Sequence, residues 1–192
     1  MSLFIESDLR QRARAGTPVY KSAGGVLQER LRVLASVAEF DIFLSHSFTD
    51  QELILGIMMS LEDLGYKVYV DWVHDSQLSR DRVTTETAQV LRKRMAMSKS
   101  LFFATTANSS ASKWMPWELG FMDGRNGKAA ILPVAQQSTG SYAGQEYLGV
   151  YPYVQRAPAN DNPRQRLWIH RSPTNYILFD QWLQGREPTE RS

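Results

Sequence analysis

The sequence predicts an α/β fold in which helices cover both faces of one open, parallel β-sheet. Two observations support this prediction. From residue 39 to residue 134, short apolar runs alternate with longer segments whose apolar residues recur at helical spacing. Helix start and stop signals also fall between these runs. Such alternation favours parallel strands joined by right-handed crossovers, and ligands of these sheets bind beyond the carboxyl ends of the strands.

The first β-α unit has recognisable boundaries. Residues 40–44 are expected to form a short buried strand. Thr49, with Glu52 three residues later, predicts a capping box that opens the first helix, and Gly65 is expected to close it. The later elements alternate in the same way: a strand at 67–70, a helix at 82–97, a strand at 100–105, a helix at 114–122 and a strand at 129–134.

This alternating region is flanked on both sides. We expect an N-terminal helical extension over residues 1–38, a central domain over residues 39–153 and a C-terminal extension over residues 154–192. The C-terminal extension is expected to end in one amphipathic helix that packs on the domain. Its apolar face is predicted to consist of Tyr176, Ile177, Phe179, Trp182 and Leu183.

Composition limits the classes of function. The 22 basic and 20 acidic residues leave a net charge of +2, which is too small to predict a nucleic acid or an anionic membrane as the partner. The chain has no cysteine, and its three histidines are isolated in sequence, so no metal site is expected. No signal-peptide pattern opens the sequence, and no apolar run approaches the ~20 residues that cross a bilayer. These features predict a cytoplasmic protein.

The common nucleotide-binding motifs are missing. No G-x-G-x-x-G follows a predicted strand, and the Gly127-Lys128 pair has Met122 where a phosphate-binding loop needs its first glycine. A dehydrogenase and an ATPase are therefore disfavoured.

Chemically distinctive residues gather where the predicted strands end. Ser45 and His46 follow the first strand, and Trp72 follows the second. The helix predicted at 114–122 starts at the same edge, and its Trp114 and Glu118 lie four residues apart, on one helical face. An indole beside a carboxylate suits a cationic, planar ligand.

Each of these residues also has a structural interpretation. Ser45 and His46 fit an ordinary turn equally well. Arg80 and Arg82 are candidates to meet a pyrophosphate, yet they also fit a solvated loop and helix start. Trp72 fits a core aromatic as well as a pocket wall, and by spacing alone Glu118 fits an exposed acid near a helix N-terminus.

Three motifs, in this order, resemble the Toll/interleukin receptor (TIR) domain, specifically its stand-alone bacterial form. They are the run Asp41-Ile42-Phe43-Leu44-Ser45-His46-Ser47, the strand end Val70-Asp71-Trp72, and Ser112-Lys113-Trp114 with Glu118. The resemblance covers about residues 39–153 and implies a flavodoxin-like fold. It departs from the receptor and adaptor pattern at Met115, where a cysteine is usual, and in the segment 74–82, which lacks the common Pro-Gly pair.

The resemblance implies cleavage of NAD⁺, which is a substrate here and not a bound cofactor. The enzymatic members carry a glutamate at the position of Glu118, which is therefore the expected catalytic residue. Phe43, Ser45, His46 and Trp114 are expected near the ligand. The product implied is nicotinamide with ADP-ribose or a cyclic ADP-ribose, used in Thoeris-like defence against phage, with activity switched on by homo-oligomerisation and the product sensed by a downstream effector.

Two other functions remain open from the sequence. A non-enzymatic TIR scaffold would act through TIR-TIR assembly and would not need Glu118. A nucleoside deoxyribosyltransferase-like enzyme also uses a carboxylate on a similar sheet, and would process nucleosides without needing the pyrophosphate.

Overall fold

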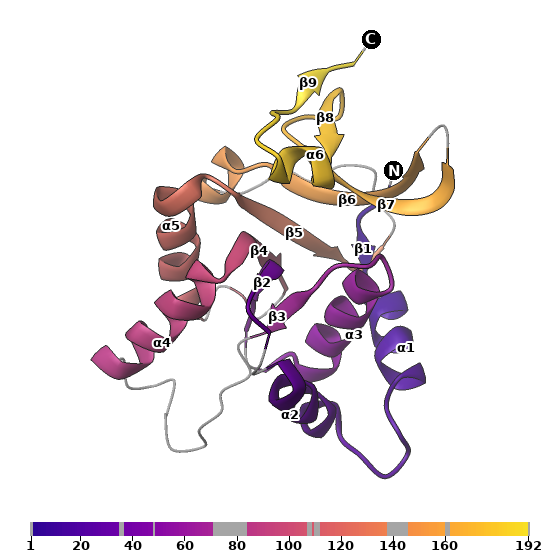
Figure 1. The fold of residues 1–192 in the computed structure, drawn as a ribbon. Coiled ribbons are helices and arrows are strands. Elements are labelled where there is room, and N and C mark those ends of the chain that lie inside the picture. The colour runs from indigo at the N-terminus through magenta and orange to yellow at the C-terminus, as the bar shows by residue number, and fades with distance from the viewer. Residues whose placement is uncertain are drawn as a thin grey trace.

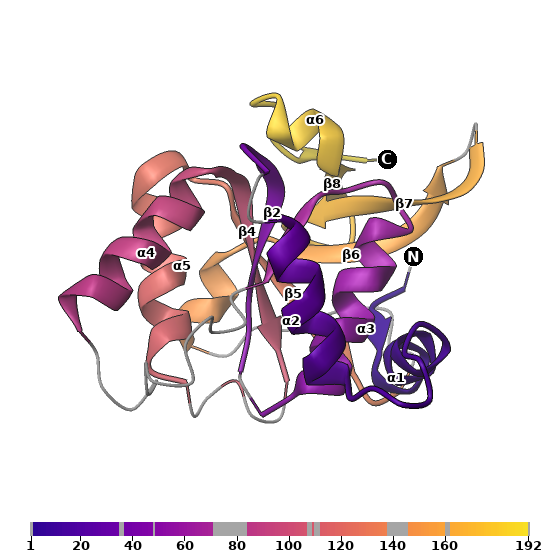
Figure 2. The same cartoon turned by 60° about the horizontal axis from the view of Figure 1, so that its bottom comes forward.

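The computed structural model describes residues 2–34, 37–47, 49–70, 84–106, 109, 112–137, 146–159 and 162–191. Figure 1 shows one sheet running through the molecule, with α4 (Thr85–Ala96) and α5 (Trp114–Asn126) on one face. The other face carries α2 (Ala23–Leu34) and α3 (Gln51–Glu62), as Figure 2 shows from a second side. The predicted layer arrangement, with helices on both faces, is confirmed.

Parallel strands form the centre of the sheet. Their order is β3 (Val68–Val70), β2 (Phe40–Ser45), β4 (Ser98–Thr105), β5 (Ala129–Ala135) and β6 (Tyr153–Ala159). Each neighbouring pair among them is parallel. With β2 as the first strand of the unit, this is the 2-1-3-4-5 order of flavodoxin-like folds. The fold class predicted from the alternating pattern is therefore confirmed.

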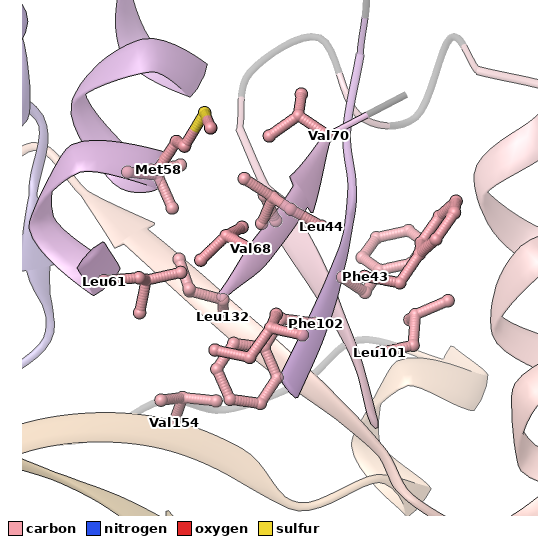
Figure 3. Packing of buried hydrophobic residues seen from close by; sticks show 14 of the residues in the cluster. Phe43, Leu44, Met58, Leu61, Val68, Val70, Leu101, Phe102, Leu132 and Val154 are labelled. Atoms are coloured by element: carbon pink, nitrogen blue, oxygen red, sulfur yellow. The ribbon is translucent and has the colours of Figure 1, made fainter. Parts of the chain in front are cut away.

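The strands β2, β4 and β5 are buried on both faces because helices cover each side. Figure 3 shows Phe102 and Leu132 on the side of Met58 and Leu61 of α3, while Phe43 points to the opposite side. Helix α3 is apolar nearly all round, and every residue from 53 to 59 is buried. A helix with no polar face needs cover on several sides. The sheet, α2 and α1 (Glu6–Ala15) provide it.

The N-terminal segment is part of the sheet. Strand β1 (Phe4–Ile5) pairs in parallel with the end of β5, at Val134 and Ala135. The backbones of Ser2 and Arg156 of β6 exchange two hydrogen bonds of 3.0 Å. This segment thus joins β5 to β6 beyond the point where those two strands pair directly. The boundaries expected at residues 38 and 153 stay a prediction.

The capping box predicted at Thr49 and Glu52 is wrong. Helix α3 has Asp50 as its N-cap, without a side-chain capping bond. Glu52 instead accepts hydrogen bonds from Arg10 at 3.0 Å and Arg14 at 2.6 Å, both on α1. Two contacts that are distant in sequence, 42 and 38 positions apart, thus replace the predicted local capping box. Gly65 does end the following turn, in the left-handed region at φ 94°.

The C-terminal region continues the sheet with antiparallel strands. These are β7 (Asn162–His170), β8 (Asn175–Leu178) and β9 (Thr189–Glu190), added in that order after β6. The single helix predicted from Tyr176 to Leu183 is therefore wrong in its first half. Only α6 (Phe179–Leu183) is helical. The ring of its Phe179 lies 5.0 Å from that of Phe102 in β4.

Among the described residues, no helix is long and apolar enough to cross a membrane.

Buried His170 makes the stability of this antiparallel region depend on pH. It is 1% exposed, its ring stacks between Tyr153 and Tyr176, and its Nδ1 lies 3.3 Å from the Ser172 carbonyl. Burial lowers the pKa of His170 to about 4. An unfolded chain binds this proton at about pH 6.5, whereas the folded chain does not until about pH 4. We therefore expect stability to fall as the pH drops through this window, by about 3 kcal/mol in total.

Urea unfolding at intervals from pH 7 to pH 4 tests this expectation, with a His170→Gln variant as the reference. Carboxylates titrate in the lower part of the window in both proteins. The informative quantity is therefore the difference in slope between them from pH 6.5 to pH 5. Equal slopes there would contradict a neutral, buried His170.

Candidate active site

The helix that carries Glu118 begins at the carboxyl edge of the sheet. Ser112 lies just before the N-cap residue Lys113, and its Oγ accepts a hydrogen bond from the Met115 backbone N–H at 3.3 Å. Pro116 lies in the first turn, where the missing N–H costs no helical hydrogen bond. The helix ends at Gly127, in the left-handed region at φ 64°. The local sequence therefore determines both ends of α5.

Glu118 meets Ser45 in the interior. The Ser45 hydroxyl donates to Glu118 Oε2 at 2.6 Å, and the two residues are 1% and 3% exposed. Ser45 and Phe43 lie two residues apart on β2, so both face α5. A buried carboxylate is costly unless donors stabilise its charge, and a hydroxyl at this short distance does so. Two residues 73 positions apart thus form the polar centre of the site.

His46, the next residue, is 2% exposed, and its Nδ1 lies 2.9 Å from the Leu44 carbonyl oxygen. A carbonyl only accepts, so Nδ1 carries the proton. In the neutral ring, Nε2 is then the basic nitrogen. The backbone of β2 thus sets the tautomer of a histidine beside Ser45.

A second carboxylate links two strand ends. Asp50, 8% exposed, follows β2 and accepts a hydrogen bond from the Thr106 hydroxyl just after β4. Nearby, the Ser47 hydroxyl lies 3.1 Å from that of Thr49. These contacts tie together the loops that bring Ser45 and His46 to the edge. Neither Asp50 nor Thr106 was predicted as a site residue, although each follows a predicted strand; their contact depends on the fold.

Trp114 lies one turn before Glu118 and is 6% exposed. Its ring and that of Trp117 pack edge to face, with centroids 5.4 Å apart, and Trp117 stacks on Phe121 at 5.9 Å. The Arg92 guanidinium of α4 lies over Trp117, 5.4 Å from the ring centre. This aromatic row holds the first turns of α5 in place. Within the described part of the chain, the indole Nε1 of Trp114 is buried without a hydrogen-bond partner.

The structure places five of the eight predicted site residues. Ser45, His46, Trp114 and Glu118 come from the end of β2 and the start of α5. Phe43 lies deeper on β2, fully buried, with its ring 5.4 Å from Tyr69 (Figure 3). The remaining three, Trp72, Arg80 and Arg82, lie outside the described residues.

This arrangement is suited to stabilising positive charge. Glu118 supplies a buried carboxylate, whose interaction with a cation is stronger than it would be in water. Trp114 adds an aromatic surface on the same helical face. No three His, Asp or Glu side chains in the described ranges gather closely enough to hold a metal ion.

Comparison with known proteins gives the family. No family model matches the chain. The chain is 46% identical to a Bacillus cereus protein named "Probable 3' cyclic ADP-D-ribose synthase ThsB'", over 193 aligned residues that cover 96% of this chain and 99% of that protein. A Cytobacillus dafuensis protein named "Putative cyclic ADP-D-ribose synthase TIR2" is 39% identical over 83 residues, 43% of this chain and 22% of that protein. Similarity at this level over nearly the whole length shows that the chain belongs to the family of ThsB', the stand-alone bacterial TIR proteins.

Proposed function

We propose that this protein cleaves the nicotinamide–ribose bond of NAD⁺ and closes the remaining ADP-ribose into a cyclic product. The buried Glu118, held by Ser45 at 2.6 Å on the carboxyl side of the sheet, is the observation that carries the proposal. The 46% identity to a protein named as a 3' cyclic ADP-D-ribose synthase supports the same reaction and favours the 3' isomer.

The chemistry needs little more than a well-placed negative charge. Nicotinamide is cationic while attached to the ribose and leaves as a neutral base, taking the bonding electron pair with it. Positive charge then develops on the ribose, as in glycoside cleavage. The Glu118 carboxylate stabilises that oxocarbenium-like transition state electrostatically. Attack by a hydroxyl of the adenosine ribose, with loss of its proton, closes the ring, whereas attack by water gives ADP-ribose.

Ring closure has to compete with water. An internal hydroxyl held close to the ribose carbon has a large effective concentration, which favours the cyclic product. The burial of Ser45, His46 and Glu118 supports such an outcome, because water is largely excluded from their side chains. We therefore expect the cyclic product to predominate over ADP-ribose.

Product analysis tests the proposed function. Purified protein at high concentration is incubated with NAD⁺, and nicotinamide, ADP-ribose and the cyclic isomers are resolved by chromatography with mass detection. Release of nicotinamide together with a cyclic ADP-ribose supports the proposal. A folded protein that leaves NAD⁺ intact even when crowded would favour the non-enzymatic TIR scaffold instead.

The proposal extends to the setting of the reaction. We expect activity to rise steeply with protein concentration, because the resemblance to TIR enzymes implies that a neighbouring copy completes the site. The product would then act on a downstream effector in anti-phage defence. The cytoplasm is the expected location, since the substrate NAD⁺ is present there.

Removing the Ser45 hydroxyl is expected to slow the proposed reaction. Ser45→Ala leaves Glu118 without its 2.6 Å donor, and a hydrogen bond to a buried charge accounts for about a ten- to hundredfold change in rate. Steady-state NAD⁺ cleavage measures the loss, and Ser45→Thr, which keeps the hydroxyl, should restore part of it. Ser47→Ala is the matched control, because that hydroxyl faces Thr49 and not Glu118. Equal losses in the two alanine variants would contradict a specific contact with Glu118.

A further inference from the structure

We infer that the indole N–H of Trp114 is a hydrogen-bond donor for the carboxamide oxygen of the nicotinamide ring, so that this residue selects the leaving group. The inference rests on the proposed function and adds a specificity role to it. A buried N–H without an acceptor costs about 1–3 kcal/mol, and native proteins keep few such groups. Nε1 of Trp114 is such a group in the described part of the chain, in a residue only 6% exposed. An acceptor supplied by the substrate would remove that cost.

The position of Trp114 relative to Glu118 indicates which part of NAD⁺ Trp114 would contact. Helix α5 connects the parallel strands β4 and β5, so it starts at the carboxyl edge of the sheet and runs back toward the opposite edge. Trp114, in its first turn, therefore lies nearer the carboxyl edge than Glu118. The Cβ atoms of residues four apart on one helical face lie about 5–6 Å apart. This matches the span from the ribose hydroxyls, the expected partners of Glu118, across the pyridine ring to its carboxamide. One helical face thus spans the bond that breaks, with the acid on the sugar side and the donor on the ring side.

The chemistry of Trp114 also favours an amide oxygen over a phosphate. An indole N–H is neutral and donates a single hydrogen bond. A phosphate brought against a buried, uncharged wall would lose its hydration without gaining a cation, which is unfavourable. A carboxamide oxygen is a neutral acceptor and pays a much smaller desolvation cost.

A chemical double-mutant cycle tests the inference. NAD⁺ is compared with pyridine adenine dinucleotide, which lacks the carboxamide, for the parent and for Trp114→Phe. Trp117→Phe is the matched control, because it makes the same change on the same helix at a half-buried ring that lies over Phe121 and under Arg92. For Trp114→Phe we expect kcat/KM to fall about tenfold more for NAD⁺ than for the analogue, the equivalent of one hydrogen bond. For Trp117→Phe, the two dinucleotides should be affected equally.

An equal loss for both dinucleotides in Trp114→Phe would overturn the inference, since the ring would then act by packing alone. If the parent releases the pyridine base from neither dinucleotide, the proposed function fails instead, and the two failures are distinguishable. A second measurement does not depend on turnover. In a Glu118→Gln protein labelled with ¹⁵N, the Trp114 indole N–H resonance should move downfield on addition of NAD⁺ and stay in place with the pyridine analogue. A shift with neither, although both bind, would also overturn the inference.

Discussion

Glu118→Gln is expected to lower the rate of NAD⁺ cleavage by about a thousandfold while leaving the fold intact. The amide has nearly the same shape and can still accept the Ser45 hydrogen bond, so packing around the site is retained. What is lost is the negative charge that, in the proposed reaction, stabilises the ribose as its bond to nicotinamide breaks. Because Glu118 is only 3% exposed, solvent ions cannot replace that charge. Single-turnover release of nicotinamide is the measurement.

Asp123→Asn is the matched control for this prediction. It removes the same charge from the same helix, at an exposed side chain that accepts a hydrogen bond from the Tyr151 hydroxyl at 3.2 Å. We expect its rate to stay within about twofold of the parent, as surface changes remote from the reacting atoms rarely alter a barrier. A Glu118→Gln protein that keeps a tenth of the parent rate, or a control that loses as much, would rule out the catalytic role of Glu118.

The sequence predicts several of the residues that the structure brings together around Glu118. Helical spacing predicts Trp114 and Glu118 on one face, and the end of the first strand predicts Ser45 at the same edge of the sheet, so only the contact between Ser45 and Glu118 had to come from the fold. Resemblance to TIR domains supplied the chemical role. The link between Asp50 and Thr106 was beyond sequence reasoning, because it depends on how two loops 56 positions apart fold toward each other.

The fold was predictable where one pattern dominated. Parallel strands buried on both faces appear as continuous apolar runs, and residues 42–44, 101–104 and 129–134 are such runs. The C-terminal region mixes two patterns within eight residues. Tyr176 and Ile177 belong to β8, whereas Phe179 and Trp182 belong to α6, yet together they fit one helical face. A short strand that runs directly into a short helix cannot be separated from a longer helix by periodicity alone.

Helices α1 and α3 are closer than ordinary side chains allow, and a single methyl group tests that contact. A Cβ added at Gly56 of α3 would lie 2.0 Å from the Leu9 carbonyl oxygen and 2.6 Å from its carbon. Both are backbone atoms, so no side-chain rotation relieves the clash and α1 has to move away. That movement would open the packing of Leu9 and Ala13, both fully buried, and stretch the 2.6 Å ion pair between Arg12 and Asp63.

Gly56→Ala is therefore expected to destabilise the protein by about 3 kcal/mol, a typical cost of overpacking against atoms that cannot yield. For a chain of this size the melting temperature should fall by about 10 °C.

Gly124→Ala is the control, because a Cβ there meets nothing within 4 Å and the residue lies inside α5. Alanine is the better helix former, so this variant should gain about 0.5–1 kcal/mol. If Gly→Ala lowers the free energy of unfolding at position 56 and raises it at position 124, helix propensity cannot be the reason. The close contact between α1 and α3 would then be what requires Gly56. If Gly56→Ala were as stable as the parent, α1 would not be held against α3, and the N-terminal segment would contribute little to the stability of the sheet that carries Ser45.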